Sequence, residues 1–252
     1  MGEGLLGLFD SEGARSLISY LDRRRKLYLG VFAIGFVSGY PMAELIIEWL
    51  LDSDGYIPVG VEVIILQPLE VILLQLRIAA QIAFGLTIAT IILDLSWTGG
   101  ELFPEAASRF SRSSGSTRVV SAILAVTALG VMGLAYAHNV LVPFLLEYLA
   151  EDSAESGLQS TWQLQSWVGF VTGLYFSSVL GFQVPILAVL LIRSGLIERG
   201  TIVENRGAIW FGALFLGALI SPPDPISLFL VGGPMLVLLE VALIYEGFTN
   251  RG

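Results

Sequence analysis

The sequence predicts an all-α polytopic membrane protein with six transmembrane helices, and three observations support this fold class. First, 55% of the 252 residues are hydrophobic and only 14% are charged, whereas soluble domains average about 25% charged residues. Second, long apolar stretches that contain glycine and alanine recur along the chain. Third, the cationic residues gather in alternate connections between these stretches, which is typical of membrane proteins with a fixed orientation.

The expected spans follow from the apolar runs, because about 20 residues in a helix cross the hydrocarbon core and satisfy their own backbone groups there. The fifth run would reach only about 21 Å at about 1.5 Å per residue, so helices 5 and 6 are expected to be short. No hydrophilic stretch is long enough for a second domain, which predicts one membrane domain over residues 1–252. The six spans are residues 27–47, 69–93, 119–142, 167–192, 207–220 and 226–245.

The charges predict the orientation of these spans. Lys and Arg precede the first span, lie between spans two and three or four and five, or follow the sixth. The opposite connections contain only acidic charges, and Arg77 alone lies inside a span. By the positive-inside rule, both termini are expected in the cytoplasm of a multi-pass protein of the cell membrane.

Composition also excludes several classes of function. The chain has no cysteine, and its net charge of −9 argues against a nucleic-acid surface. Twelve arginines, a single lysine and an excess of acids are typical of a salt-loving source. The single histidine, His138, and the absence of hydrolase or ATPase motifs predict no enzyme, no metal and no cofactor. An intramembrane hydrolase would have to pair His138 with Ser177 or Ser178.

Polar residues inside the spans are costly unless they are paired or face a cavity. Glu70 and Arg77 are seven residues apart, so they share a helix face and lie about 10 Å apart along the axis. They would serve as a structural pair, as interfacial charges or as ligand contacts. Gln183 lies next to Pro185, which predicts either a packing site or a groove at a helix kink. Asp224, in a proline-rich turn, is expected to cap the following helix.

Five segments, taken in order, resemble motifs of the TatC family of the twin-arginine protein translocase. The resemblance covers nearly the whole chain, and Pro234 and Glu240 follow the last motif at the distance seen in the family. The segments are residues 19–27 (SYLDRRRKL), residues 67–77 (QPLE and the later Arg77), residues 133–143 (GLAYAHNVLVP), residues 181–185 (GFQVP) and residues 221–224 (SPPD).

The resemblance implies a receptor that binds twin-arginine signal peptides of folded cargo on its cytoplasmic face. It further implies recruitment of TatA/TatB-type single-span proteins, transport driven by the proton-motive force, and a homo-oligomer within the complex. Carboxylates suit this role, because they hold guanidinium groups by charge-assisted hydrogen bonds. The implied signal-peptide residues are Asp22, Arg24, Lys26, Glu101 and Glu105, and the implied intramembrane or partner contacts are Glu70, Arg77, Gln183, Ser221, Asp224 and Glu240.

The chain departs from the family pattern at three positions, one of which is Leu228, where some relatives have glutamine near the outer end of helix six. Ser116 stands where the family has a second acidic residue, and Glu101 or Glu105 in the same loop would have to replace it. Gln183 stands where many relatives have glutamate, and an amide forms hydrogen bonds but does not titrate. The alternative function is a small secondary transporter or permease subunit with Glu70, Arg77 and Gln183 around a midplane site.

Overall fold

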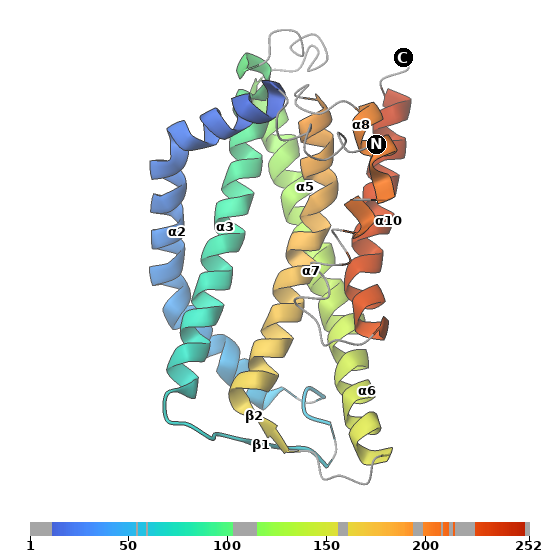
Figure 1. Ribbon diagram of the computed structural model, residues 1–252. Coiled ribbons are helices and arrows are strands. Elements are labelled where there is room, and N and C mark those ends of the chain that lie inside the picture. Colours follow the sequence, from blue (N-terminus) through green and yellow to red (C-terminus); the bar gives the residue numbers. More distant parts are fainter. Residues whose placement is uncertain are drawn as a thin grey trace.

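The protein is a bundle of long helices that stand side by side (Figure 1), seen here in a computed structural model. The bundle has two ends. We call the end where α2 passes Arg23, Arg24 and Arg25 the arginine end, and the end with the two short strands the strand end. The structure describes residues 12–53, 55–58, 60–102, 115–155, 161–193, 199–207, 209–211, 214 and 225–249.

The elements follow one another with little irregular chain between them. A π-helix, η1, joins α5 directly to α6, and the two three-residue strands pair in parallel, with Val63 opposite Trp162. In chain order the elements are α2 (Glu12–Asp52), β1 (Glu62–Ile64), α3 (Glu70–Leu102), α5 (Gly115–Tyr136), η1 (Ala137–Leu141), α6 (Val142–Glu155), β2 (Thr161–Gln163), α7 (Leu164–Arg193), α8 (Arg199–Glu204) and α10 (Pro225–Thr249).

The predicted all-α polytopic fold class is confirmed. Four helices in the described residues are long and apolar enough to cross a membrane, and Gly232–Tyr245 of α10 is a shorter apolar helix. Much of the predicted fifth span, and both chain termini, lie outside the described residues, so the six-span count and the single domain stay predictions. The four long candidates are Ile18–Asp52, Glu70–Trp97, Val120–Glu151 and Leu164–Ile192.

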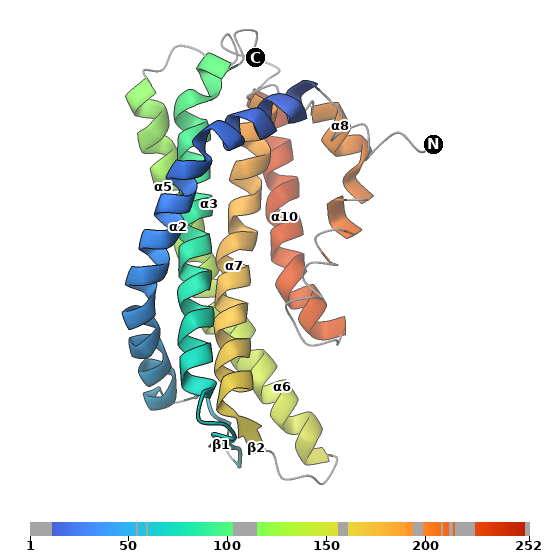
Figure 2. The same ribbon diagram turned by 60° about the vertical axis from the view of Figure 1, so that its left-hand side comes forward.

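Three of these helices extend well past the bounds that apolarity predicts, and one of them is α3, which continues to Leu102 beyond the predicted end at residue 93. The N-terminal part of α2 forms an arm that lies across the arginine end of α3 and not along the bundle, as the two views show (Figures 1 and 2). The third span continues to Glu155 because η1 inserts one wider turn just before Pro143, where Val142 N–H bonds to Ala137 O. A proline has no N–H to donate, and a π turn absorbs that defect without ending the helix.

Small residues bring the helices into close contact. A side chain at Gly35 of α2 would come within 3.0 Å of Ala83 Cα of α3, and one at Gly133 of α5 within 2.8 Å of Ser178 O of α7. Such close backbone approach is usual for membrane helices. In lipid the hydrophobic effect does not drive helices together, and small residues allow the van der Waals contacts that do. In the described chain α7 is the central helix, since it contacts α3, α5 and α10.

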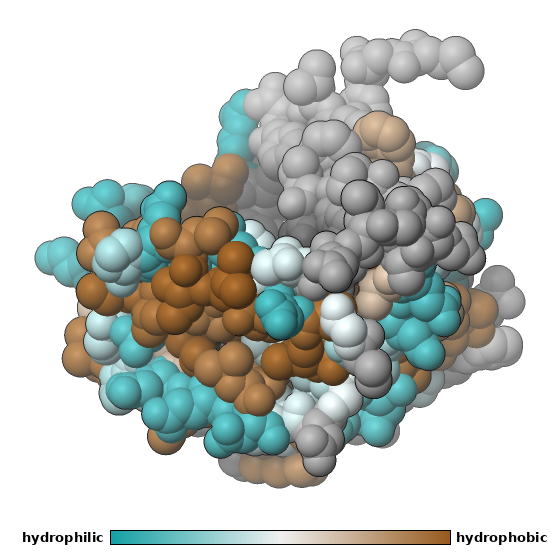
Figure 3. All heavy atoms as spheres, turned by 90° about the horizontal axis from the view of Figure 1, so that it is seen from below, coloured by the Kyte–Doolittle hydropathy of each residue, from teal (hydrophilic) through white to brown (hydrophobic). Residues whose placement is uncertain are grey.

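Large apolar side chains cover the outside of the bundle. Ile34 and Val37 of α2 are each 73% exposed, and Val237 of α10 is 63% exposed. The strand end also has an apolar surface with hydrophilic residues around it (Figure 3), and exposed Ile65 and Leu66 follow β1 there. In water such surfaces would aggregate, so their extent agrees with a bundle that stands in lipid.

Candidate functional site

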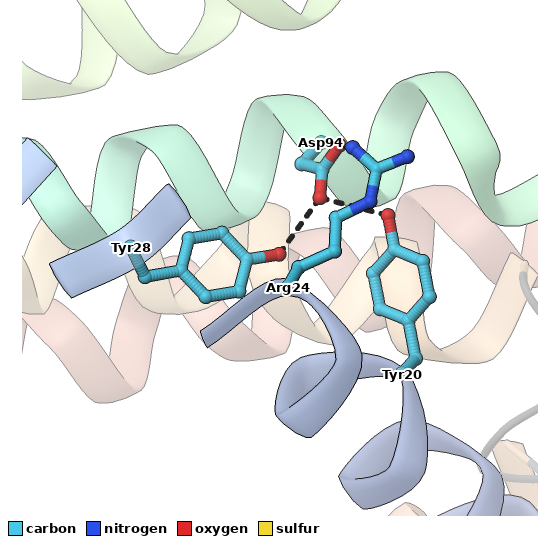
Figure 4. A network of polar contacts seen from close by, with 4 residues as sticks. All are labelled: Tyr20, Arg24, Tyr28 and Asp94. Atoms are coloured by element: carbon cyan, nitrogen blue, oxygen red, sulfur yellow. Dashed lines mark hydrogen bonds and ion pairs between the residues drawn. The ribbon is translucent and has the colours of Figure 1, made fainter. Parts of the chain in front are cut away.

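A polar network at the arginine end joins the arm of α2 to α3 (Figure 4). Tyr20, Arg24 and Tyr28 are spaced four residues apart, so they lie on one face of α2. That face meets Asp94 near the end of α3. The network therefore holds together two segments that are about 70 residues apart in the chain.

Both carboxylate oxygens of Asp94 are occupied. Arg24 Nη1 lies 2.6 Å from Asp94 Oδ1, and the hydroxyls of Tyr20 and Tyr28 each donate to Oδ2 at 2.7 Å. The Asp94 side chain is only 11% exposed, whereas that of Arg24 is 40% exposed and also lies 5.4 Å from the Tyr20 ring centre. A shielded carboxylate with one cationic and two neutral donors is a stable anchor for the arm.

The opposite face of the arm carries the acidic residue predicted to bind signal peptides. Asp22 is two positions from both Tyr20 and Arg24, which turns it about 200° away from the network. Its side chain is 68% exposed and makes one weak contact, 3.3 Å from Arg25 Nη1. Lys26 is also exposed. The structure thus separates the predicted set, with Arg24 inside the network and Asp22 and Lys26 on the open face.

Several predicted site residues cannot be compared with the structure. Glu101 lies in the last turn of α3, but its side chain is outside the described residues. Glu105, Ser221 and Asp224 lie entirely outside them. Whether a loop acid replaces the one missing at Ser116 therefore stays a prediction.

Glu70 caps a helix at the strand end. Its Oε1 accepts hydrogen bonds from Leu66 N at 3.0 Å, Gln67 N at 2.8 Å and Gln163 Nε2 at 2.7 Å, and the side chain is fully buried. The Glu70 carboxylate reaches back to the backbone N–H of Gln67, three residues earlier, as the acidic residue of a capping box does. Since Gln163 belongs to β2, the cap also joins α3 to the strand pair.

The three residues of the permease alternative do not share one site in the structure. Glu70 bonds to Gln163, and Gln183 lies 20 positions further along the same run of chain, about 30 Å away by helical rise. Gln183 is buried between α7 and α5, where its Nε2 donates to Val126 O at 3.2 Å. Arg77 rests against Gly169 of α7. A midplane substrate site made of all three is therefore not formed.

The last predicted contact residue, Glu240, ties α10 to the segment after α8. Glu240 Oε2 lies 3.5 Å from Arg206 Nη1, and Trp210 Nε1 donates to Glu240 Oε1 at 3.3 Å. Both contacts are long and partly exposed, so they stabilise this junction only weakly.

The single histidine forms no hydrolytic pair in the structure. His138 Nδ1 lies 2.7 Å from the hydroxyl of Tyr56 and 3.0 Å from that of Tyr175, while Ser177 Oγ donates to Leu174 O. Within the described chain no cluster of three or more His, Asp or Glu residues could hold a metal ion.

Sequence reasoning missed Asp94, Tyr20 and Tyr28. Asp94 directly follows the predicted span 69–93, and an acid at the end of an apolar run was a usable signal, because such a residue needs a partner. The sequence alone did not show which residues pair with Asp94, since they belong to another helix, α2.

Comparisons with known proteins show which family this chain belongs to and which solved structures share its fold. The family model for the Sec-independent protein translocase protein (TatC) matches residues 17–234. The TatC protein of Escherichia coli (strain K12) is 30% identical over 130 residues, about half the length of either chain, and TatCy of Bacillus subtilis (strain 168) is 25% identical over 94% of this chain and 90% of its own. A crystal structure of the twin-arginine translocase receptor TatC in DDM covers 93% of this chain and 99% of its own, with a TM-score of 0.69 and 21% identity. The chain therefore belongs to the TatC family and is a multi-pass membrane protein with that fold.

Proposed function

We propose that this protein is the receptor subunit of a twin-arginine translocase and binds signal peptides of folded cargo at its arginine end. The observation that carries the proposal is the anchored arm, whose network faces α3 while Asp22 stands on the open side. An exposed carboxylate on a fixed helix suits a guanidinium group, which it holds through two parallel hydrogen bonds. The names of the relatives support the same role.

The sidedness of the proposal comes from the charges. Twelve of the thirteen cations belong to the tails or to the predicted connections between spans two and three and between spans four and five, and the described Arg23, Arg24 and Arg25 lie at the arginine end. The positive-inside rule then puts that end, and both termini, in the cytoplasm, where cargo is made. The function is recognition and transport and not catalysis, and the energy source is the proton-motive force.

Partner recruitment is the second part of the proposal. A cavity of about 610 Å³ opens between α3, α5, α7 and α10, and its walls are largely apolar. Val241 and Tyr245 of α10 line it and are 57% and 61% exposed. Such a surface fits the apolar helix of a TatA/TatB-type single-span protein, packed side by side in the membrane. The hydrogen bond from the buried Gln183 to Val126 O joins α7 to α5, two of the helices that line this cavity.

The test is photo-crosslinking of a twin-arginine precursor to this chain in membranes. We expect labelling of the wild-type protein, and a several-fold loss either with a Lys-Lys precursor or with Asp22→Asn. Glu48→Gln is the matched control, because Glu48 is an exposed acid on the same helix at the strand end. Equal labelling in all cases would overturn the proposal.

A further inference from the structure

Arg77 is a cation on the lipid-facing part of a membrane span. It lies seven residues into the Glu70–Trp97 span, about 10 Å from the strand end of α3 by helical rise. Its side chain is exposed, and the neighbouring Leu73 and Phe84 of α3 are 48% and 49% exposed. The surroundings of the guanidinium group on α3 are therefore apolar and open to lipid.

The guanidinium group lies on a bed of two glycines in α7. A side chain at Gly169 would come within 2.6 Å of Arg77 Nη1, and one at Gly173 within 3.9 Å of Nη2. The two glycines are one helical turn apart and are buried, so the missing side chains leave the room that the planar group fills. Packing against Gly169 and Gly173 therefore fixes the position of the guanidinium group.

None of the described residues gives Arg77 a hydrogen bond or an ion pair. The acid on the same face of α3, Glu70, already accepts three hydrogen bonds at its Oε1, from Leu66, Gln67 and Gln163. All five N–H donors of the guanidinium group are thus left for a ligand.

A guanidinium group inside a membrane span is costly unless it reaches an anion or water. Helical side chains tilt toward the N-terminus of their helix, and the N-terminus of α3 is at the strand end. Arg77 therefore leans toward the headgroups of that leaflet. The planar, weakly hydrated fork of donors matches a phosphate group, which it binds in a bidentate manner.

We propose that Arg77, held on the Gly169 and Gly173 bed, binds the phosphate of an anionic phospholipid in the leaflet at the strand end. The exposed apolar side chains beside it, Leu73 and Phe84, contact the acyl chains of the same lipid. Arg77 is the one cation of the sequence outside the arginine-end connections and tails, so a lipid phosphate at this level has a single cation to bind. This inference needs only the membrane position of α3 and does not rest on signal-peptide binding.

The test is native mass spectrometry of the purified full chain titrated with phosphatidylglycerol. We expect the wild-type protein to retain one phosphatidylglycerol that Arg77→Gln binds about tenfold more weakly or loses, since a charge-assisted hydrogen bond is removed. Arg77→Lys keeps the charge without the fork and is expected to fall between the two. Gly169→Ala pushes the guanidinium group off its bed and is expected to weaken binding even though Arg77 is intact.

Controls separate this site from general attraction. Arg25→Gln removes an arginine that is 67% exposed at the other end and should leave the phosphatidylglycerol count unchanged. Equal occupancy in the wild-type and Arg77→Gln proteins would overturn the proposal, and so would an equal loss in Arg25→Gln. Displacement of the lipid by glycerol 3-phosphate at the same concentration would point to a soluble phosphate, and equal binding of phosphatidylcholine would show that no anionic headgroup is selected. Either result contradicts the proposal.

Discussion

Two carboxylates at opposite ends of α3 are held in different ways. Glu70 at the strand end is fully buried and accepts its hydrogen bonds from neutral donors, two of them backbone N–H groups within four residues. Asp94 at the arginine end is slightly exposed and is bonded to a cation and two hydroxyls from another helix. The hydrogen bonds of Glu70 are local and cap the N-terminal end of α3. Those of Asp94 form only if α2 lies across α3.

The two carboxylates differ in how easily their contacts can be broken. A charge held by neighbouring backbone groups moves only if the helix end unravels. An ion pair with a partner that is 40% exposed can respond to salt, to substitution or to a competing cation. We therefore infer that the strand end is the rigid part of the bundle and that the arm at the arginine end is the part that can respond.

The largest expected effect is at Glu70. Glu70→Ala leaves three donors, including the Gln163 amide, without their acceptor, and the melting temperature in detergent should fall by about 10 °C. Differential scanning fluorimetry measures this change. A matched control is Glu62→Ala, an exposed acid of β1 whose loss should have little effect. A fall no larger than that of the control would mean that the cap does not stabilise the strand end.

The next effect is at Asp94. Asp94→Asn removes the negative charge that pairs with Arg24 and one of the two acceptor oxygens, and it should cost about 2 kcal/mol, or roughly 5 °C in melting temperature. Asp94→Glu should recover part of it. At a temperature where the Asp94→Asn protein is still folded, its yield of signal-peptide crosslinking should fall, because the arm that presents Asp22 is released. If the crosslinking yield falls only at temperatures where the protein also unfolds, Asp94 acts only by stabilising the fold.

Salt should distinguish the two ends of α3. At about 0.1 M salt Arg24→Gln is expected to cost about 1 kcal/mol, and at about 1 M that cost should roughly halve, because the Debye length drops from about 10 to 3 Å. The effect of Glu70→Ala should not change with salt, since Glu70 has no cationic partner among the described residues. Thermal melts at the two salt concentrations compare the variants. A salt response at Glu70 would contradict the distinction between the two ends.

The smallest expected effect is at Glu240. Its contacts to Arg206 and Trp210 are long and partly exposed, so Glu240→Gln should change stability by at most about 0.5 kcal/mol. A change above about 1.5 kcal/mol in thermal melts would mean that this junction, and not the arm network, is the main ionic anchor at the arginine end.

How far the sequence predicts the molecule depends on whether a feature is local. Apolar runs predicted four spans that overlap long helices, because insertion into lipid is decided within one segment, but several of these helices continue past the apolar run. The capping role of Glu70 was also readable from its spacing to Gln67, yet the sequence interpretation left Glu70 as a structural pair with Arg77, an interfacial charge or a ligand contact. The Asp94 network was not readable, because its donors are 66 to 74 residues away and meet only when α2 turns across α3.

We infer that the anchored arm presents Asp22 to the paired arginines of a signal peptide. The most direct measurement is a binding cycle with purified protein, in which wild type and Asp22→Asn are each titrated with a labelled Arg-Arg signal peptide and with its Gln-Gln version. We predict that Asp22→Asn weakens Arg-Arg binding about tenfold and leaves Gln-Gln binding unchanged, a coupling of about 1.4 kcal/mol. Equal losses for both peptides, or no loss for either, would contradict the claim.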